Sequence, residues 1–169
     1  VFSESGAAAE TLTLDRGRPY HAALTYLRQR IVARLHGRRI VAIAHRVVHG
    51  GSKYFEPVRV DAAVLAELKS YIPLAPLHQP FALEAIGALL DELPQLPQVA
   101  CFDTAFHQSM PTVEKMLPLP RSAWEQGLRR YGFHGLSYAY HAQVLGERYG
   151  DDARGRTIVA HLGSGASLC

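Results

Sequence analysis

The sequence QVACFDTAFHQSMP, residues 98–111, decides the fold. Its opening run, Val99–Phe102, is continuously apolar, which is typical of a strand that is covered on both faces of a sheet. The run ends abruptly at Asp103 and Thr104. In an α/β protein, polar groups at the carboxyl end of a buried strand lie where ligands bind. The alternative is that Asp103 only caps a turn or a short helix, but the motifs around it favour the ligand-binding interpretation.

Helical and strand patterns alternate on both sides of this stretch. Apolar residues recur at i, i+3 and i+4 in the helical patterns, and short apolar runs mark the strands. We expect helices over residues 19–35, 60–71, 81–93 and 137–149, strands over 40–44, 98–102 and 157–160, and an edge strand over 11–14. The proline-bounded residues 73–80 should form a loop without regular structure. This order predicts an α/β fold with at least some parallel strands.

The composition is that of an ordinary soluble globular protein. The 169 residues are 48% hydrophobic and 20% charged, enough for one domain with a real core or for one domain and the start of another. Two cysteines are too few for a disulfide framework. Cys101 lies in an apolar run, so we expect a buried thiol and a reducing, cytoplasmic location. We see no signal peptide and no apolar run long enough to span a membrane.

A small excess of positive charge gives little support to nucleic-acid binding. The formal net charge is +3, and several arginines cluster within residues 28–39. Aromatic residues do not alternate with them, as a groove for single-stranded nucleic acid would need. We therefore interpret the cluster as a solvated helix face.

Polar, glycine-rich sequence follows three of the predicted strands. His45–Gly51 follows the apolar run Ile40–Ala44, Asp103 follows Phe102, and His161–Gly165 follows the last predicted strand. If these strands are parallel neighbours, their polar ends lie together at one edge of the sheet.

The residues at these ends suit phosphoryl transfer, which depends mainly on positioning and positive charge. Arg46 could bind an anion through two hydrogen bonds. Asp103 could orient a metal-bound water or a nucleophile, and His134 could donate a hydrogen bond to charge that develops in a transition state. Glycines at the strand ends would let backbone N–H groups approach phosphate oxygens; they are Gly50, Gly51, Gly163 and Gly165.

Other phosphate and metal motifs do not match. HLGSG lacks the lysine and the spacing of a Walker A loop, and it is not a dinucleotide-binding fingerprint. Taken singly, glycines after a strand more often serve a tight hairpin. His45 and His49 are four residues apart, but they lie in a non-helical stretch without further zinc-ligand spacing, so we expect no histidine-based zinc site.

Five motifs over Ile40–Cys169 resemble the acetate kinase family in their order and approximate spacing. They are HRVVHGG (45–51), APLHQP (75–80), FDTAFHQSMP (102–111), RRYGFHGLS (129–137) and AHLGSGAS (160–167). The resemblance implies the fold of the acetate and sugar kinase/Hsc70/actin superfamily, with two ribonuclease-H-like domains and the active site between them. It also implies reversible transfer of the ATP γ-phosphoryl group to acetate, with Mg²⁺, giving acetyl phosphate and ADP.

The resemblance assigns roles to individual positions. Arg46 matches the arginine that binds the carboxylate or acyl phosphate, and Val48 and Leu77 match the pocket around the acetate methyl group. His78 matches an active-site histidine near the transferred phosphoryl group. Asp103 matches the catalytic aspartate; because a carboxylate nucleophile is already ionised at neutral pH, positioning suits it better than general-base catalysis.

The remaining roles lie in the last two motifs. Phe133 matches the substrate-pocket phenylalanine, and His134 matches the histidine that stabilises the transition state. The turn that contacts the nucleotide phosphates matches His161, Leu162, Gly163, Ser164 and Gly165. The family often has Asn at two positions that are Gln79 and Ser164 here. We expect Gln79 to preserve packing and the Ser164 hydroxyl to donate to phosphate.

We expect this chain to be a piece of a longer protein. It begins with Val1 and ends inside a predicted hairpin, so residues 1–156 would be an incomplete first domain and residues 157–169 the first hairpin of a second. The resemblance places the metal ligands and much of the ATP site outside the chain, so the piece alone should be inactive. It also suggests a homodimer. A propionate or butyrate kinase and a non-catalytic remnant of the fold stay open as alternatives. If this chain exists alone, residues 157–169 should expose an unpaired apolar hairpin, which would favour aggregation.

Overall fold

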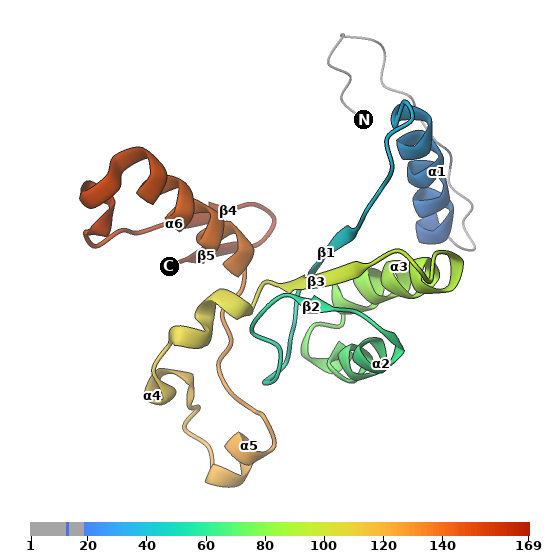
Figure 1. Ribbon diagram of the computed structural model, residues 1–169. Coiled ribbons are helices and arrows are strands. Elements are labelled where there is room, and N and C mark those ends of the chain that lie inside the picture. The colour runs from blue at the N-terminus through green and yellow to red at the C-terminus, as the bar shows by residue number, and fades with distance from the viewer. Residues whose placement is uncertain (1–12, 14–18) are drawn as a thin grey trace. The chain divides into compact units, whose positions relative to one another are not determined.

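The computed structural model describes Thr13 and residues 19–169. Contacts divide the chain into two compact units, Val1–Arg39 and Ile40–Cys169. In the first unit, helix α1 spans Pro19–Arg34, as predicted (Figure 1). The backbone then takes positive φ angles at His36 and Gly37, where glycine commonly ends a helix. The strand predicted over residues 11–14 lies, apart from Thr13, outside the described residues.

The second unit is built around a three-stranded sheet with the order β1-β3-β2 (Figure 1). Strand β3, Gln98–Phe102, lies in the middle and is parallel to β1, Ile43–Val47. Strand β2, Val58–Arg59, is antiparallel to β3. Because Val47 is paired with Phe102, the parallel strands β1 and β3 end at the same level. The prediction of parallel strands with their polar ends together is confirmed for these two.

Two helices contribute their apolar faces to the hydrophobic core that they share with this sheet. They are α2, Ala62–Ser70, and α3, Gln79–Glu92. Leu65 and Leu68 of α2 pack with Leu83 and Ile86 of α3, as their helical spacing predicted. The strands contribute Val47, Ala100 and Phe102 to the same cluster. Each fully buried side chain of this size contributes about 1.5–3 kcal/mol of transfer free energy, so the cluster fixes the strands that lead to the polar ends. The Asp61 carboxylate caps α2 by accepting from the Val64 N–H (2.8 Å).

The strands are less buried than their apolar sequences predicted. Alternate residues of β3 are buried, while Val99 and Cys101 on the other face are half-buried, so Cys101 is not the buried thiol that we expected. Strand β1 begins at Ile43, and it contains His45 and Arg46 rather than ending before them. Within the described residues β1 pairs only with β3, so it is an edge strand whose alternate side chains face solvent.

The proline-bounded segment 73–80 has more regular structure than predicted. Residues Ile72–Leu74 form a 3₁₀ helix, η1, and α3 begins at Gln79 rather than Phe81. Pro80 causes no conflict, because a helix's first turn does not use its N–H groups. Short helical turns follow β3: η2 (Ala105–Ser109), α4 (Thr112–Lys115) and α5 (Arg121–Glu125).

The last part of the chain is a long helix followed by a hairpin. Helix α6 spans Gly135–Tyr149, two residues longer than predicted, and the 3₁₀ helix η3 covers Gly150–Arg154. Strands β4, Ala160–Leu162, and β5, Ala166–Leu168, pair antiparallel, so the strand lies later than the predicted residues 157–160.

The hairpin exposes apolar side chains, as predicted: Ile158, Leu162 and Leu168 are all largely exposed. Whether it lies in a separate domain from residue 157 onward stays a prediction. Among the described residues, no helix is both long enough and apolar enough to cross a membrane.

Candidate active site

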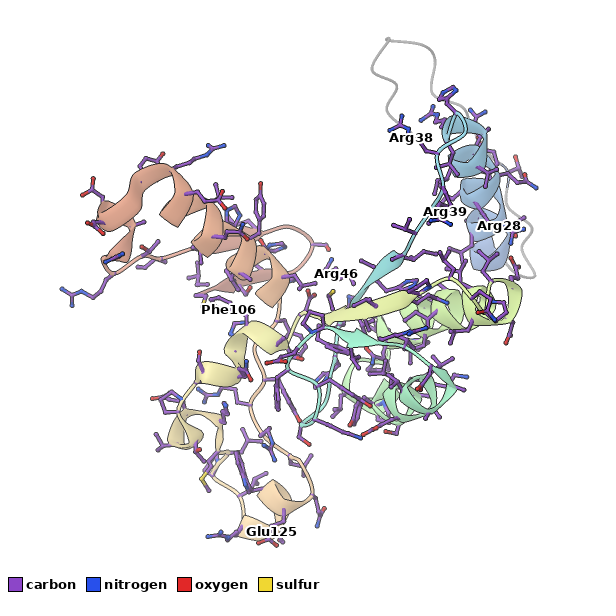
Figure 2. All side chains as sticks on the ribbon, in the orientation of Figure 1. Arg28, Arg38, Arg39, Arg46, Phe106 and Glu125 are labelled. Carbon is purple, nitrogen blue, oxygen red and sulfur yellow. The ribbon has the colours of Figure 1, made fainter. Side chains whose placement is uncertain are left out.

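An ion pair between Arg46, which Figure 2 labels, and Asp103 joins the ends of the two parallel strands. The Arg46 Nη2 donates to Asp103 Oδ2 at 2.6 Å, and Nε lies 3.1 and 3.0 Å from Oδ1 and Oδ2. The Asp103 side chain is 2% exposed and that of Arg46 is 61% exposed. Hydrogen bonding to Asp103 raises the pKa of the Arg46 guanidinium above its ordinary value. The buried carboxylate thus orients a guanidinium whose outer edge is open to solvent.

The backbone around Asp103 connects β3 to both neighbouring segments. The Asp103 N–H donates to the Val47 carbonyl of β1 (3.1 Å), and its own carbonyl accepts from the N–H of Gly135, the first residue of α6 (2.8 Å). The hydroxyl of buried Thr104 accepts from the Gly50 N–H (3.2 Å). The predicted alternative, a side-chain cap by Asp103, is not observed among the described residues, because the carboxylate oxygens bond to Arg46.

The glycines of HRVVHGG have a different role from the predicted one. The Gly50 N–H bonds to Thr104 and the Gly51 N–H to His49 Nδ1 (2.9 Å), so neither is free for a phosphate. A Cβ on Gly50 would lie 2.2 Å from the Tyr54 carbonyl oxygen, and one on Gly51 would lie 2.4 Å from the Tyr71 ring. These glycines therefore permit close packing behind the strand ends.

His134 lies opposite this ion pair, immediately before α6. Its backbone is in the left-handed region, with φ 58°, which non-glycine residues seldom adopt. Nδ1 lies 2.8 Å from the Ser167 hydroxyl of β5, and the ring stacks on that of His161 with centroids 4.1 Å apart. Burial lowers the pKa of His134 below its ordinary value, and the nearby His161 adds to the shift. The ring is therefore mostly neutral at physiological pH.

These side chains line one open pocket of about 470 Å³. It brings together seven residues that the resemblance had selected: Arg46, Val48, His78, Asp103, Phe133, His134 and Gly165. Leu77 is not among the lining residues and is 78% exposed. The other four residues of the predicted nucleotide-contacting turn, His161, Leu162, Gly163 and Ser164, also lie outside the lining. Six further lining residues had been given no role in substrate binding or catalysis, and five of them lie within the quoted motifs; they are Leu74, which lies outside the motifs, and Ala75, Tyr131, Gly132, Ala166 and Ser167.

Gln79 supports the pocket from behind, in agreement with the packing role that we expected. Its buried amide Oε1 accepts from the His49 N–H (3.1 Å), and its Nε2 donates to the His49 carbonyl (2.9 Å). This pair of hydrogen bonds joins the segment after β1 to the start of α3. It thereby fixes the neighbouring His78, which is exposed at the pocket.

The buried imidazole of His49 should make stability depend on pH. Burial lowers its pKa from 6.5 to about 4, so between these values the unfolded state binds more protons than the folded state, and stability falls as pH falls. We expect His49 to account for about 2 kcal/mol of lost stability between pH 7 and pH 5. Urea unfolding of wild type and His49→Asn at both pH values tests this, because Asn can still accept from Gly51. An equal loss in both proteins would contradict it.

Among the described residues, the pocket offers a carboxylate to a metal ion but no complete metal site. Residues 13 and 19–169 contain no group of three or more His, Cys, Asp or Glu side chains placed to hold a metal ion. Asp103 is the acidic residue of the pocket lining. Mg²⁺ commonly uses one or two carboxylates together with substrate phosphates and water, so Asp103 suits one ligand position.

Comparison with known proteins agrees with the motifs. The model of the acetokinase family matches residues 3–169. The acetate kinase of Rhizobium meliloti is 51% identical over 148 residues, and that of Rhodopseudomonas palustris (strain ATCC BAA-98 / CGA009) is 46% identical over 170 residues. These matches cover 88% and 100% of this chain, but only 37% and 43% of the relatives.

Solved structures give the same fold. The crystal structure of Porphyromonas gingivalis acetate kinase is 39% identical, with a TM-score of 0.72. The match covers 85% of this chain and 39% of the acetate kinase chain. The crystal structure of a propionate kinase from Francisella tularensis subsp. tularensis SCHU S4 is 38% identical, with a TM-score of 0.77. This match covers 88% of our chain and 39% of the propionate kinase. The predicted α/β fold class is confirmed. The chain belongs to the acetokinase family and spans well under half the length of these relatives.

Proposed function

We propose that this chain is part of an acetate kinase, which transfers the ATP γ-phosphoryl group reversibly to acetate and forms acetyl phosphate and ADP. The observation that carries the proposal is the convergence of Arg46, Asp103 and His134 on one pocket. Each residue comes from a separate motif, and the family membership of the chain supports the same reaction.

The pocket offers two positive or hydrogen-bonding groups to an acyl phosphate. Arg46 donates through Nε and Nη2 to Asp103, and its remaining N–H groups are available to a carboxylate or phosphoryl oxygen. His134 Nε2 has no hydrogen-bond partner among the described residues, and it can donate to the charge that develops on the transferred group. Because acetate is ionised at neutral pH, its oxygen attacks without a general base.

Mg²⁺ would be held partly by Asp103 and would neutralise charge on the nucleotide phosphates. The predicted contribution of the turn at residues 161–165 to nucleotide binding is part of this proposal. Gly165 supports it because it lines the pocket.

The acyl group would contact the apolar part of the pocket, where Val48 and Phe133 lie. Such a pocket selects by volume, and one methylene contributes only about 1–3 kcal/mol of discrimination. Propionate is therefore the second candidate substrate, and the likeness to a propionate kinase favours keeping it.

We also propose that the full-length protein is a cytoplasmic homodimer and that its ligands are small molecules rather than nucleic acid. The family membership supports this assembly and location. The alternative outside the enzymes is a non-catalytic remnant, a protein that keeps the fold but catalyses no reaction.

The proposal predicts ATP-dependent acyl phosphate formation by the full-length protein that carries this chain. Hydroxylamine traps the product, and kcat/KM is measured for acetate, propionate and butyrate with ATP and Mg²⁺. We expect acetate to rank first, with about a 10-fold or greater loss for each added methylene. A higher rank for propionate would change the substrate assignment. No product with any acid would favour the non-catalytic remnant.

A further inference from the structure

Ser167 on β5 connects the C-terminal hairpin to His134. Its hydroxyl lies 2.8 Å from His134 Nδ1 and also bonds to the Tyr138 hydroxyl. Tyr138 lies on α6, four residues after His134, which immediately precedes the helix, and it is 2% exposed. The imidazole and the phenol therefore meet the same serine at the start of α6.

Two residues of the β4–β5 hairpin contact the His134 imidazole, one on its face and one at its edge. In the β4–β5 pairing, Ser167 is directly opposite His161. His161 stacks on the face of the His134 ring with an interplanar angle of 13°, while Ser167 bonds to its edge. The position of the ring is therefore fixed by two neighbouring residues of one hairpin.

The direction of the hydrogen bonds decides which ring nitrogen carries the proton. If Tyr138 donates to Ser167 and Ser167 donates to Nδ1, the neutral ring must carry its proton on Nε2. Nε2–H is then a donor, and Nε2 is the nitrogen without a partner among the described residues. In the reverse direction Nδ1–H donates to Ser167, and Nε2 carries no proton. Nε2 could then only accept a hydrogen bond, and its lone pair would repel a phosphoryl oxygen.

We propose that Ser167, fixed by Tyr138, is a positioning residue that holds His134 in the Nε2–H tautomer and aims this donor into the pocket. The inference rests on the proposed phosphoryl-transfer function. It extends that function, because Ser167 acts through His134 and does not itself touch the reacting groups.

The test combines kinetics with the tautomer of His134 in the full-length protein. In Ser167→Ala we expect kcat to fall about 10–100-fold, since removing one transition-state donor costs about 10²–10³-fold and the ring is only mispositioned here. KM for acetate and ATP should change less than about 2-fold, because the loss is confined to the transition state. Ser167→Thr keeps the hydroxyl and should recover most of the lost kcat.

The matched control is Ser70→Ala, which removes another serine hydrogen bond, to the Glu67 carbonyl, at the end of α2 and away from the pocket. It should keep wild-type kcat. Histidine ¹⁵N chemical shifts should show the Nε2–H tautomer in wild type and a mixture of tautomers in Ser167→Ala, with His134→Asn identifying the signals. Should Ser167→Ala fail to fold, Tyr138→Phe replaces it, with the same direction of change.

Unchanged kcat and tautomer in Ser167→Ala would overturn the inference, as would an Nδ1–H tautomer in the wild type. A wild-type protein without kinase activity would overturn the proposed function instead. The ¹⁵N comparison would still decide whether Ser167 sets the tautomer, so the two failures are distinguishable.

Discussion

Asp103→Asn in the full-length protein should lower kcat for acyl phosphate formation by about 10²–10³-fold, the scale of losing one electrostatic contact to a transition state. The substitution keeps the shape of a side chain that is 2% exposed but removes the charge that accepts from Arg46. The guanidinium then loses its fixed orientation, and the metal ligand that we propose at this position is lost as well. Steady-state kinetics with acetate, ATP and Mg²⁺ measure the change.

A second substitution separates the two roles of Asp103. If it acted only by orienting Arg46, then adding Asp103→Asn to Arg46→Lys should lower kcat little further, because residues in one network are not additive. A further loss in the double variant indicates a contribution independent of Arg46. Wild-type kcat in Asp103→Asn would contradict the proposed site.

Gly135→Ala should destabilise the protein by about 3 kcal/mol or more, at the upper end of the cost of overpacking. A Cβ on Gly135 would lie 2.3 Å from the Asp103 carbonyl oxygen and 2.8 Å from Phe106 Cβ. The first of these atoms belongs to the backbone that carries the Asp103 carboxylate of the proposed site, so it cannot move without displacing that site. We therefore expect a loss of kcat together with the loss of stability.

Gly146→Ala, in the same helix, is the matched control. A Cβ there has no neighbour within 4 Å, and Ala is favoured over Gly inside a helix by about 1 kcal/mol. It should raise the unfolding midpoint, whereas Gly135→Ala should lower it. Thermal unfolding of both variants measures the difference, and a similar effect of the two substitutions would contradict the close approach of α6 to Asp103.

The sequence predicted the elements whose signal is local. The spacing of Leu65 and Leu68, or of Leu83 and Ile86, is a property of one helix, and the structure buries these residues as predicted. The polar change at Asp103 is also local, and it does mark the carboxyl end of β3. By contrast, Ile40–Ala44 resembles a doubly buried strand, but burial depends on the partners of β1, which are distant in the sequence.

Nonlocal contacts account for what the sequence could not predict at the site. Gly50 and Gly51 suggested phosphate binding, yet only the structure brings Tyr54, Tyr71 and Thr104 against them. Ser167 lies within a recognised motif, but its bonds to residues 29 and 33 positions earlier depend on how the hairpin meets α6. Leu77 shows the reverse case, since its motif suggested a pocket residue that the structure leaves exposed.

A crystal structure of the full-length protein with acetyl phosphate bound tests the central claim most directly. The account predicts the phosphoryl oxygens within hydrogen-bond distance of the Arg46 guanidinium and His134 Nε2, and the methyl group against Val48 and Phe133. Acetyl phosphate bound elsewhere, with Arg46, Asp103 and His134 making no contact to it, would contradict the account.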